Sequence, residues 1–307
     1  MKPKHEAGYS EPHAEFCERT LVTLLRGLGP WKAGVYLTGG LVPRYLIPHR
    51  PGVEGPPPHA GTTDVDLVLD LELLARVEAY RRLENNLKTL GFERGTNDEG
   101  HPQHFSWRKP VGVGLVVVVD LLRDVALDEG GHVAAIDGER RLSTLGIPGA
   151  RLVVADHIEV ELTAELLDER GVATENVRVA NIVPFIVLKA LAYDDRVEEK
   201  DAYDLIYCLM RYADGPPAVA AAFADGLDRW PDDPLPRRAL TILRARFASD
   251  ERTRGARKDG PTSYARFRTN PGQPEMNARH RQDAASVVEA FLGLVDAAAG
   301  SPGPTTR

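Results

Sequence analysis

Two aspartates separated by a single residue stand in the run GTTDVDLVLD, which spans residues 61–70. In a β-strand, Asp64 and Asp66 would point to the same side, because strand side chains alternate between two faces. Carboxylate oxygens at that spacing can bind one or two Mg²⁺ ions, which prefer oxygen ligands and substrate phosphates. A third carboxylate from a neighbouring strand would complete such a site. Asp120, at the end of the apolar run GLVVVV, is the first choice, and Asp124 is the weaker alternative.

A pair of glycines precedes the aspartates, in the stretch YLTGGLVPRY. Phosphate oxygens can approach backbone N–H groups closely where side chains are absent, so Gly39 and Gly40 are candidates to hold a triphosphate. A helix beginning after the turn would add partial positive charge there. Thr38 and Thr63 could contribute hydroxyl groups, and Arg44 a positive charge. The stretch is neither a GxxxxGK[ST] phosphate loop nor a dinucleotide-binding fingerprint.

Positioning these residues requires strands that end near one another, and hydrophobic patterning predicts such strands in the first half of the chain. The interval over residues 48–61 is too rich in Pro and Gly for regular structure and is expected to form a surface loop. The expected elements are a helix over 15–28, strands over 34–38 and 64–70, a helix over 71–90, an antiparallel hairpin of 104–110 and 114–122, and strands over 151–162 and 176–182.

The second half of the chain reads as helical throughout. Five segments have helical length and patterning: residues 184–196, 198–214, 216–227, 233–248 and 281–299. We therefore expect an α+β fold, with a mixed sheet and flanking helices followed by an all-helical carboxy-terminal domain. The predicted domains are residues 1–180 and 181–300, with a disordered tail over 301–307.

A cation within the apolar stretch FIVLKALAY is a further candidate for chemistry. Burying Lys189 is costly unless its ammonium reaches a phosphate or pairs with a carboxylate. Asp201 and Asp204 share one face of the next predicted helix and could supply that carboxylate. Both partners remain open from the sequence. Tyr203 and Tyr207, on the same helix, are expected to pack in the core.

These motifs together resemble the nucleotidyltransferase superfamily, which has a polymerase-beta-like fold. The matching pattern is TGG, TTDVDL and VVVVD: a glycine turn, an Asp-x-Asp strand and a third aspartate on a later strand. The stretch VLKALAYDDRVEEKDAYDLIYCL is similar to a motif of AbiEii-type nucleotidyltransferases, which include toxins of toxin–antitoxin pairs. The positions that match this second motif are Lys189, Arg196, Lys200, Asp201, Tyr203 and Asp204.

The resemblance implies transfer of a nucleotide from an NTP to an acceptor hydroxyl with Mg²⁺ or Mn²⁺, for some toxin members at the 3′ end of tRNA. It also implies tRNA and a cognate antitoxin as partners. The interval between the glycine turn and the Asp-x-Asp strand is longer than in the family, which suggests a lid or a reshaped acceptor site. The implied roles are triphosphate binding by Gly39 and Gly40, metal binding by Asp64 and Asp66, phosphate binding by Lys189, and an active-site carboxylate at Asp201.

Other functions are compatible with the same motifs. Enzymes that modify small molecules such as antibiotics share this catalytic pattern, and so do enzymes that modify protein hydroxyl groups. A non-catalytic nucleotide-binding module is the alternative from a different class. All the expected acidic positions are filled, which argues against a degenerate site.

Charge distribution, cysteine content and the lack of long apolar segments indicate possible partners and the cellular location. Residues 237–268 contain ten Lys/Arg and three Asp/Glu, a local balance of +7, whereas the whole chain carries −7, so the rest carries −14. A basic segment on an acidic body can steer a polyanion, although a solvated helix face would look the same. The two cysteines indicate neither a disulfide framework nor a zinc site. Without a signal peptide or apolar membrane span, the sequence predicts a cytoplasmic protein.

Overall fold

The chain divides into two compact units in the computed structural model, which describes residues 3–48, 58–71, 77–96, 100–112, 114–136, 139–270 and 272–300. The sheet unit comprises the described parts of residues 9–45 and 60–184. The helical unit comprises those of residues 1–8, 46–59 and 185–307. Most of the proline-rich interval and the predicted tail lie outside the described residues.

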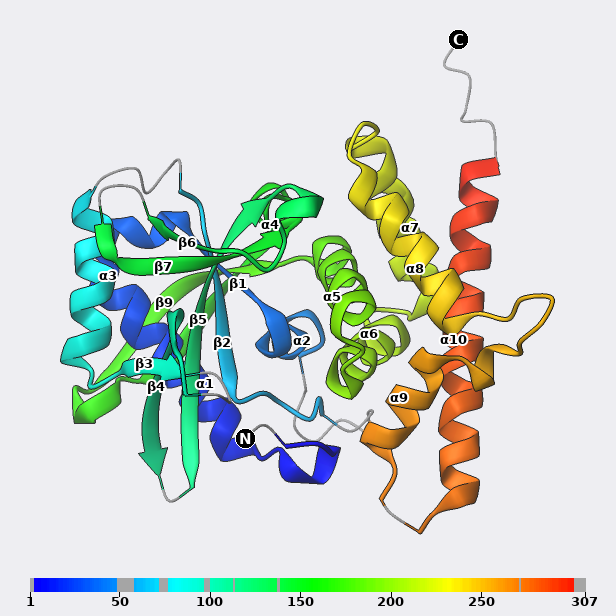
Figure 1. Cartoon of the computed structure of the whole chain (residues 1–307), viewed down its shortest axis with the longest axis horizontal. Helices are drawn as coiled ribbons and strands as arrows, with labels where there is room; N and C mark the ends of the chain where they lie inside the picture. Colours follow the sequence, from blue (N-terminus) through cyan, green and yellow to red (C-terminus); the bar gives the residue numbers. More distant parts are fainter. Residues whose placement is uncertain are drawn as a thin grey trace. The chain divides into compact units, whose positions relative to one another are not determined.

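The sheet unit contains nine strands and four α-helices in its described residues (Figure 1). Its strands are β1 (Val35–Thr38), β2 (Asp64–Leu69), β3 (Glu93–Thr96), β4 (Pro102–Gly112), β5 (Leu115–Val125), β6 (Val133–Ile136), β7 (Glu139–Pro148), β8 (His157–Glu165) and β9 (Val172–Ala180). Its helices are α1 (Glu11–Leu28), α2 (Pro43–Leu46), α3 (Val77–Thr89) and α4 (Ala150–Ala155).

The strands form one mixed sheet in the order β3-β4-β5-β2-β1-β9-β8, with β7 also pairing with β5 and β6 with β7. Central strand β2 runs antiparallel to β1 and parallel to β5, and β1 runs parallel to β9. This arrangement brings three separate stretches of the chain to the middle of the sheet. The glycine turn, the Asp-x-Asp strand and the strand with Asp120 are therefore neighbours (Figure 1).

Alternation along the central strands separates a core face from a polar face. Val65 and Leu67 of β2 are fully buried, as are their parallel partners Val119 and Leu121 of β5. The helix α1 packs on β2, β5, β8 and β9, and its buried leucines follow the helical period. Because strand side chains alternate, the intervening residues of β2 and β5 point to the opposite face.

The helical unit is built from six α-helices in its described residues. They are α5 (Ile182–Arg196), whose first turn lies in the sheet unit, α6 (Glu199–Arg211), α7 (Pro216–Arg229), α8 (Pro234–Phe247), α9 (Asp259–Arg268) and α10 (Pro274–Gly300). The long helix α10, drawn orange to red in Figure 1, packs along α6, α7, α8 and α9. Phe223 and Phe291 meet edge to face at 5.5 Å between α7 and α10. No helix in the described residues is long and apolar enough to cross a membrane.

The expected α+β class, with a mixed sheet and carboxy-terminal helices, is confirmed, and so are the β2 strand and the β4–β5 hairpin. One strand prediction was wrong in part: residues 150–155 form α4, and only residues from His157 onward form β8. The run RLVVA is short and apolar, and such runs do not distinguish strand from helix. Asp124 stabilises the start of α4 by accepting hydrogen bonds from the backbone N–H groups of Gly149 and Arg151.

The domain prediction differs from the observed units at the amino terminus and before β2. Residues 1–8 and 46–59 were expected in the catalytic domain, but their described parts group with the helical unit. The reason is a set of specific polar contacts. Glu6 pairs with Arg268 at 3.1 Å, and His59 Nε2 lies 2.8 Å from Asp204 Oδ1. Contacts between residues this distant in sequence leave no local signal.

Candidate functional site

The glycine turn at the end of β1 lies directly against the Asp-x-Asp strand. Gly39 has φ +74°, a conformation that L side chains rarely adopt. A Cβ atom at this position would lie 1.8 Å from Oδ2 of Asp66. Thr38 is the register partner of Asp66 and is buried. Only glycine therefore fits at position 39 while the Asp66 carboxylate keeps its place.

The acidic residues of β2 and β5 come together through the sheet register. Asp66 pairs with Asp120 across the parallel β2–β5 ladder, so the two side chains leave the same face of adjacent strands. Asp64 shares that face, two residues earlier, opposite Val118. The structure thus places Asp120 next to Asp66, as the apolar run before it predicted.

The residues just before β2 hold Asp64 in a polar setting. The Thr63 hydroxyl donates to Asp64 Oδ1 at 3.1 Å, and the backbone N–H of Asp64 donates to Thr62 Oγ1 at 3.2 Å. All three side chains are buried. Thr63 therefore orients a carboxylate, and the contribution of its hydroxyl to phosphate binding stays a prediction.

Arg44, expected to contact a triphosphate, pairs with carboxylates of α1. Its guanidinium makes a two-pronged contact with Glu11, at 3.0 and 2.7 Å, and a third bond to Glu18 at 3.1 Å. Burial alone would lower the pKa of Arg44, but the two glutamates outweigh it and raise that pKa above its ordinary value. These bonds fasten α2 to α1. The helix expected after the glycine turn is α2, a single turn of four residues.

Two residues of α1 near the acidic strand had no signal in the local sequence. The Cys17 thiol is buried and lies 3.8 Å from the carbonyl oxygen of Thr62. Burial raises its pKa, and the charges of Asp64 and Asp66 raise it further, so the thiol stays protonated. His13 is buried one turn earlier, and burial lowers its pKa. Both side chains lie close enough to the acidic strand for the charge of Asp64 to act on their pKa values.

Lys189 lies in the helical unit and is bound by two carboxylates. Its ammonium nitrogen lies 2.8 Å from Asp201 Oδ1 and 2.7 Å from Asp204 Oδ2. Arg196 forms two bonds to Asp201, at 2.6 and 3.0 Å, and Lys200 forms an ion pair with Asp204. Of the two possibilities open from the sequence, carboxylate pairing is the one observed. A contact of Lys189 with phosphate stays a prediction.

The opposite charges of Lys189, Asp201 and Asp204 stabilise one another strongly because these three side chains are buried. Burial alone would lower the pKa of Lys189, but Asp201 and Asp204 raise it well above its ordinary value. Burial would raise the pKa of Asp204, but Lys189 and Lys200 hold it far below its usual range. For Lys200 burial outweighs Asp204, and the pKa is lowered. Lys189 is thus the better-stabilised of the two lysines.

His59 completes the cluster and was not singled out from the sequence. Its ring packs against Tyr203 and Tyr207, with centroids 5.1 and 4.9 Å away, and it hydrogen-bonds Asp204. Burial lowers the pKa of His59 to about 4, and the charge of Lys200 adds to that effect. The histidine is therefore neutral at pH 7. A histidine within a proline-rich interval gives no local sign of such a role.

The predicted site residues thus fall into two groups. In the sheet unit Thr38, Gly39, Asp64, Asp66 and Asp120 gather at the middle of the sheet. In the helical unit Lys189 and Asp201 form an ion pair. In the described part of the chain, no three His, Cys, Asp or Glu side chains form a ready metal site. Mg²⁺ commonly takes only one or two carboxylates together with substrate phosphates, and Asp66 and Asp120 fit that requirement.

A scan against protein-family models and a search of curated proteins find no match to this chain. The family resemblance read from the motifs therefore rests on the residues themselves.

Proposed function

We propose that this chain is a metal-dependent nucleotidyltransferase that transfers a nucleoside monophosphate from an NTP to an acceptor hydroxyl. The observation that carries the proposal is the contact of the Gly39 turn with Asp66, itself the register partner of Asp120. A turn without side chains beside two carboxylates offers backbone N–H groups to phosphates and oxygen ligands to a metal. The polymerase-beta-like fold and the AbiEii-type resemblance are part of the same proposal.

In the proposed reaction, the acceptor oxygen attacks the α-phosphorus, the bond to the β-phosphate oxygen breaks, and pyrophosphate leaves. Asp66 and Asp120, with Asp64, would hold Mg²⁺ or Mn²⁺. When bound, the metal lowers the pKa of the attacking hydroxyl and neutralises developing charge. One of the carboxylates accepts the hydroxyl proton. Gly39 and Gly40 bind the triphosphate through backbone N–H groups, and Thr38 borders the same turn.

Three kinds of acceptor are compatible with this chemistry. The tRNA 3′ end, with an antitoxin as further partner, is the acceptor that the AbiEii-type resemblance favours. A cationic small molecule is the second candidate, because the chain outside residues 237–268 carries a charge of −14. A protein hydroxyl is the third. For Lys189 and Asp201, the AbiEii-type resemblance implies phosphate binding and a supporting active-site carboxylate.

The test is transfer of label from each NTP, radiolabelled at the α-phosphate, onto total tRNA, onto the protein itself and onto a panel of aminoglycosides. We expect label on one acceptor class, reduced at least ~100-fold in Asp66→Asn, since removing a group that stabilises transition-state charge has effects of this size. Asp124→Asn is the matched control, because Asp124 binds the start of α4. Equal labelling by wild type and Asp66→Asn would disprove the proposal.

A further inference from the structure

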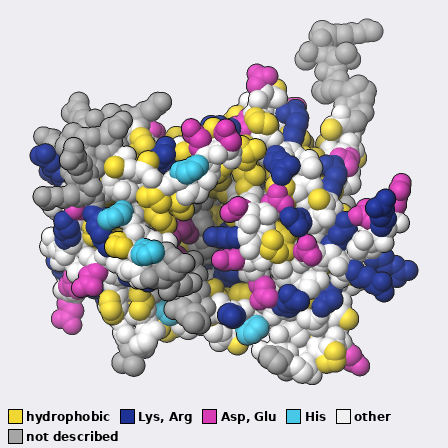
Figure 2. Space-filling view, in the orientation of Figure 1, with side chains coloured by type: hydrophobic (Ala, Val, Ile, Leu, Met, Phe, Trp, Pro, Cys, Tyr) yellow, Lys and Arg dark blue, Asp and Glu magenta, His cyan; other side chains and the backbone are white. Residues whose placement is uncertain are grey.

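The segment between α8 and α9, residues 248–258, presents three arginines to solvent. Arg252, Arg254 and Arg257 are all exposed. Within the described residues, none of the three side chains forms a hydrogen bond, ion pair or ring contact. Dark blue side chains gather at the right edge of Figure 2, where Figure 1 shows the α8–α9 connection. We refer to the segment 248–258, with its three exposed arginines, as the arginine loop.

The other basic residues of the 237–268 segment are mostly used inside the fold. Arg238 and Arg246 bind Asp194, and Arg244 binds Asp296. Arg268 binds Glu6, and Lys258 binds Asp250. The charge excess that the sequence shows over the whole segment is therefore concentrated in a few side chains. Arg237 donates to the backbone carbonyl of Pro231 at 2.8 Å. In the described part of the chain, Arg266 of α9 is the remaining exposed one whose side chain has no partner.

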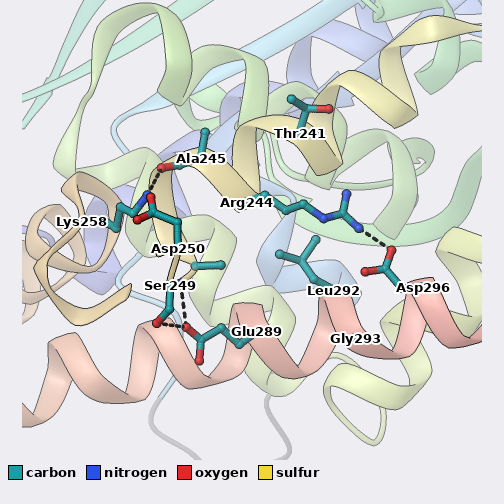
Figure 3. A pocket seen from close by; sticks show the side chains of 11 residues that line it. Thr241, Arg244, Ala245, Ser249, Asp250, Lys258, Glu289, Leu292, Gly293 and Asp296 are labelled. Carbon is teal, nitrogen blue, oxygen red and sulfur yellow. Dashed lines mark hydrogen bonds and ion pairs between the residues drawn. The ribbon is translucent and has the colours of Figure 1, made fainter. Parts of the chain in front are cut away.

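Polar side chains within the arginine loop hold its backbone in one conformation. Asp250 Oδ1 accepts hydrogen bonds from the backbone N–H groups of Arg252 and Thr253, at 2.8 and 2.7 Å. Lys258, which pairs with Asp250, also donates to the carbonyl of Ala245 at 3.1 Å. Figure 3 shows the contacts of Lys258 with Asp250 and Ala245 at one end of a pocket between α8 and α10.

A second brace joins the loop to α10. Glu289 accepts hydrogen bonds from the N–H and the hydroxyl of Ser249, at 2.8 and 2.7 Å (Figure 3). The Ser249 hydroxyl in turn accepts from the N–H of Gly255 at 2.8 Å. The carboxylates at the base of the loop are thus occupied by backbone and lysine donors. The arginines above them project from a fixed scaffold, which lowers the entropy lost when a partner binds.

From these contacts we infer that the arginine loop binds the phosphodiester backbone of a single-stranded nucleic acid. The planar guanidinium matches phosphate in a two-pronged geometry, and it is more weakly hydrated than an ammonium. Phosphate contacts from arginine supply affinity without reading sequence. The inference rests on the proposed function in one respect: in that reaction the bound strand is the acceptor RNA. The binding itself does not require the reaction.

A nucleic acid fits this surface better than a membrane does. Binding to a lipid surface through a basic segment generally adds Trp, Phe or Leu side chains that enter the bilayer. Residues 248–258, ASDERTRGARK, contain no large apolar side chain. Residues 248–258 carry four Lys/Arg against Asp250 and Glu251, so the loop offers a phosphate backbone a net charge of +2 together with guanidinium donors.

The test measures binding of fluorescein-labelled poly-uridine RNA to the full chain by anisotropy over a range of salt concentrations. The variant is R252S/R254S/R257S. Each phosphate contact to a single strand contributes about 0.7 to the slope of log K against log salt. We therefore expect the variant to bind more weakly and its slope to fall in magnitude by about 2. Label-transfer activity is assayed separately, so a failed reaction and a failed binding surface give different results.

The matched control removes the same charge elsewhere on the helical unit. R211S/R229S/R279S replaces three exposed arginines on α6, α7 and α10. We expect this control to keep the salt slope of wild type. Equal slopes for the two triple variants, or no binding of RNA by wild type, would overturn the inference. Equal binding of poly-glutamate, or of anionic phosphatidylserine vesicles, would also overturn it by assigning the loop to a different partner.

Discussion

The carboxylate of Asp66 occupies the space that a side chain on Gly39 would need, with Oδ2 only 1.8 Å from the Cβ position. The turn after β1 and the acid of β2 are thereby fitted to each other, although 26 residues of chain lie between Gly39 and Asp66. Any side chain at position 39 must displace the acid or reopen the turn.

Gly39→Ala should therefore lower the free energy of unfolding by more than the unfavourable backbone conformation alone would. The positive φ contributes roughly 1–2 kcal/mol of destabilisation, and displacement of Asp66 adds to it. Gly91→Ala is the control, because Gly91 has φ +73° and nothing lies within 4 Å of its Cβ position. Urea unfolding of both variants measures the difference. Equal losses of unfolding free energy would mean that the Asp66 contact is not tight.

Substitution of each candidate third carboxylate in turn should show which of the two binds the metal and which has a structural role. Asp120→Asn is expected to weaken Mn²⁺ binding at least ~10-fold in the presence of a non-hydrolysable NTP, because a metal ligand is lost. Asp124→Asn should leave Mn²⁺ binding unchanged and change the unfolding free energy little, because the Asn side-chain oxygen can accept the same N–H bonds at the start of α4. Titration followed by electron paramagnetic resonance measures the metal. The reverse result would make Asp124 the ligand.

The buried His59 should make stability depend on pH. Its pKa is about 4 in the fold, against an ordinary value of 6.5. Between these values the unfolded chain binds more protons, so the free energy of unfolding rises with pH through this window. The stabilisation is complete above pH 6.5 and decreases as pH falls toward 4, by roughly 3 kcal/mol in total.

Urea unfolding across that pH range, compared between wild type and His59→Gln, isolates this contribution. His13 and His280 also have lowered pKa values, but their effects are present in both proteins and cancel in the difference. Parallel pH profiles for the two proteins would show that His59 is not buried against Lys200 and Asp204.

Lys189→Met should be far more destabilising than Lys200→Met. The fold raises the pKa of Lys189, so its charge is stabilised by Asp201 and Asp204, whereas it lowers the pKa of Lys200. Removing one partner of a buried ion pair typically costs 3–5 kcal/mol. We expect a loss of that size for Lys189→Met and a clearly smaller one for Lys200→Met, measured by chemical unfolding. Similar losses would indicate that the two lysines share the carboxylates equally.

The stability of these two variants also decides how a loss of activity is interpreted. A loss of nucleotide transfer in Lys189→Met counts as catalytic only under conditions where the variant is folded. Near-UV circular dichroism at the assay temperature provides that check.

The sequence by itself determined the elements whose patterns are local. Alternation in DVDLVLD, the apolar run before Asp120 and the helical spacing after residue 181 each reflect which side chains must be buried, and these predictions hold in the structure. The candidate acids of β2 follow from the same alternation, because two carboxylates at strand spacing share a face whatever surrounds them.

Only the tertiary structure decided which of these groups meet. The parallel register places Asp120 beside Asp66, and hydrogen bonds to the start of α4 occupy Asp124. Arg44 turned out to bind glutamates of α1, and His59 joined the cluster around Asp204. These pairings depend on strand register and on contacts across long sequence separations. Local side-chain patterns carry no information about either, because burial fixes the face of a residue but not its neighbour.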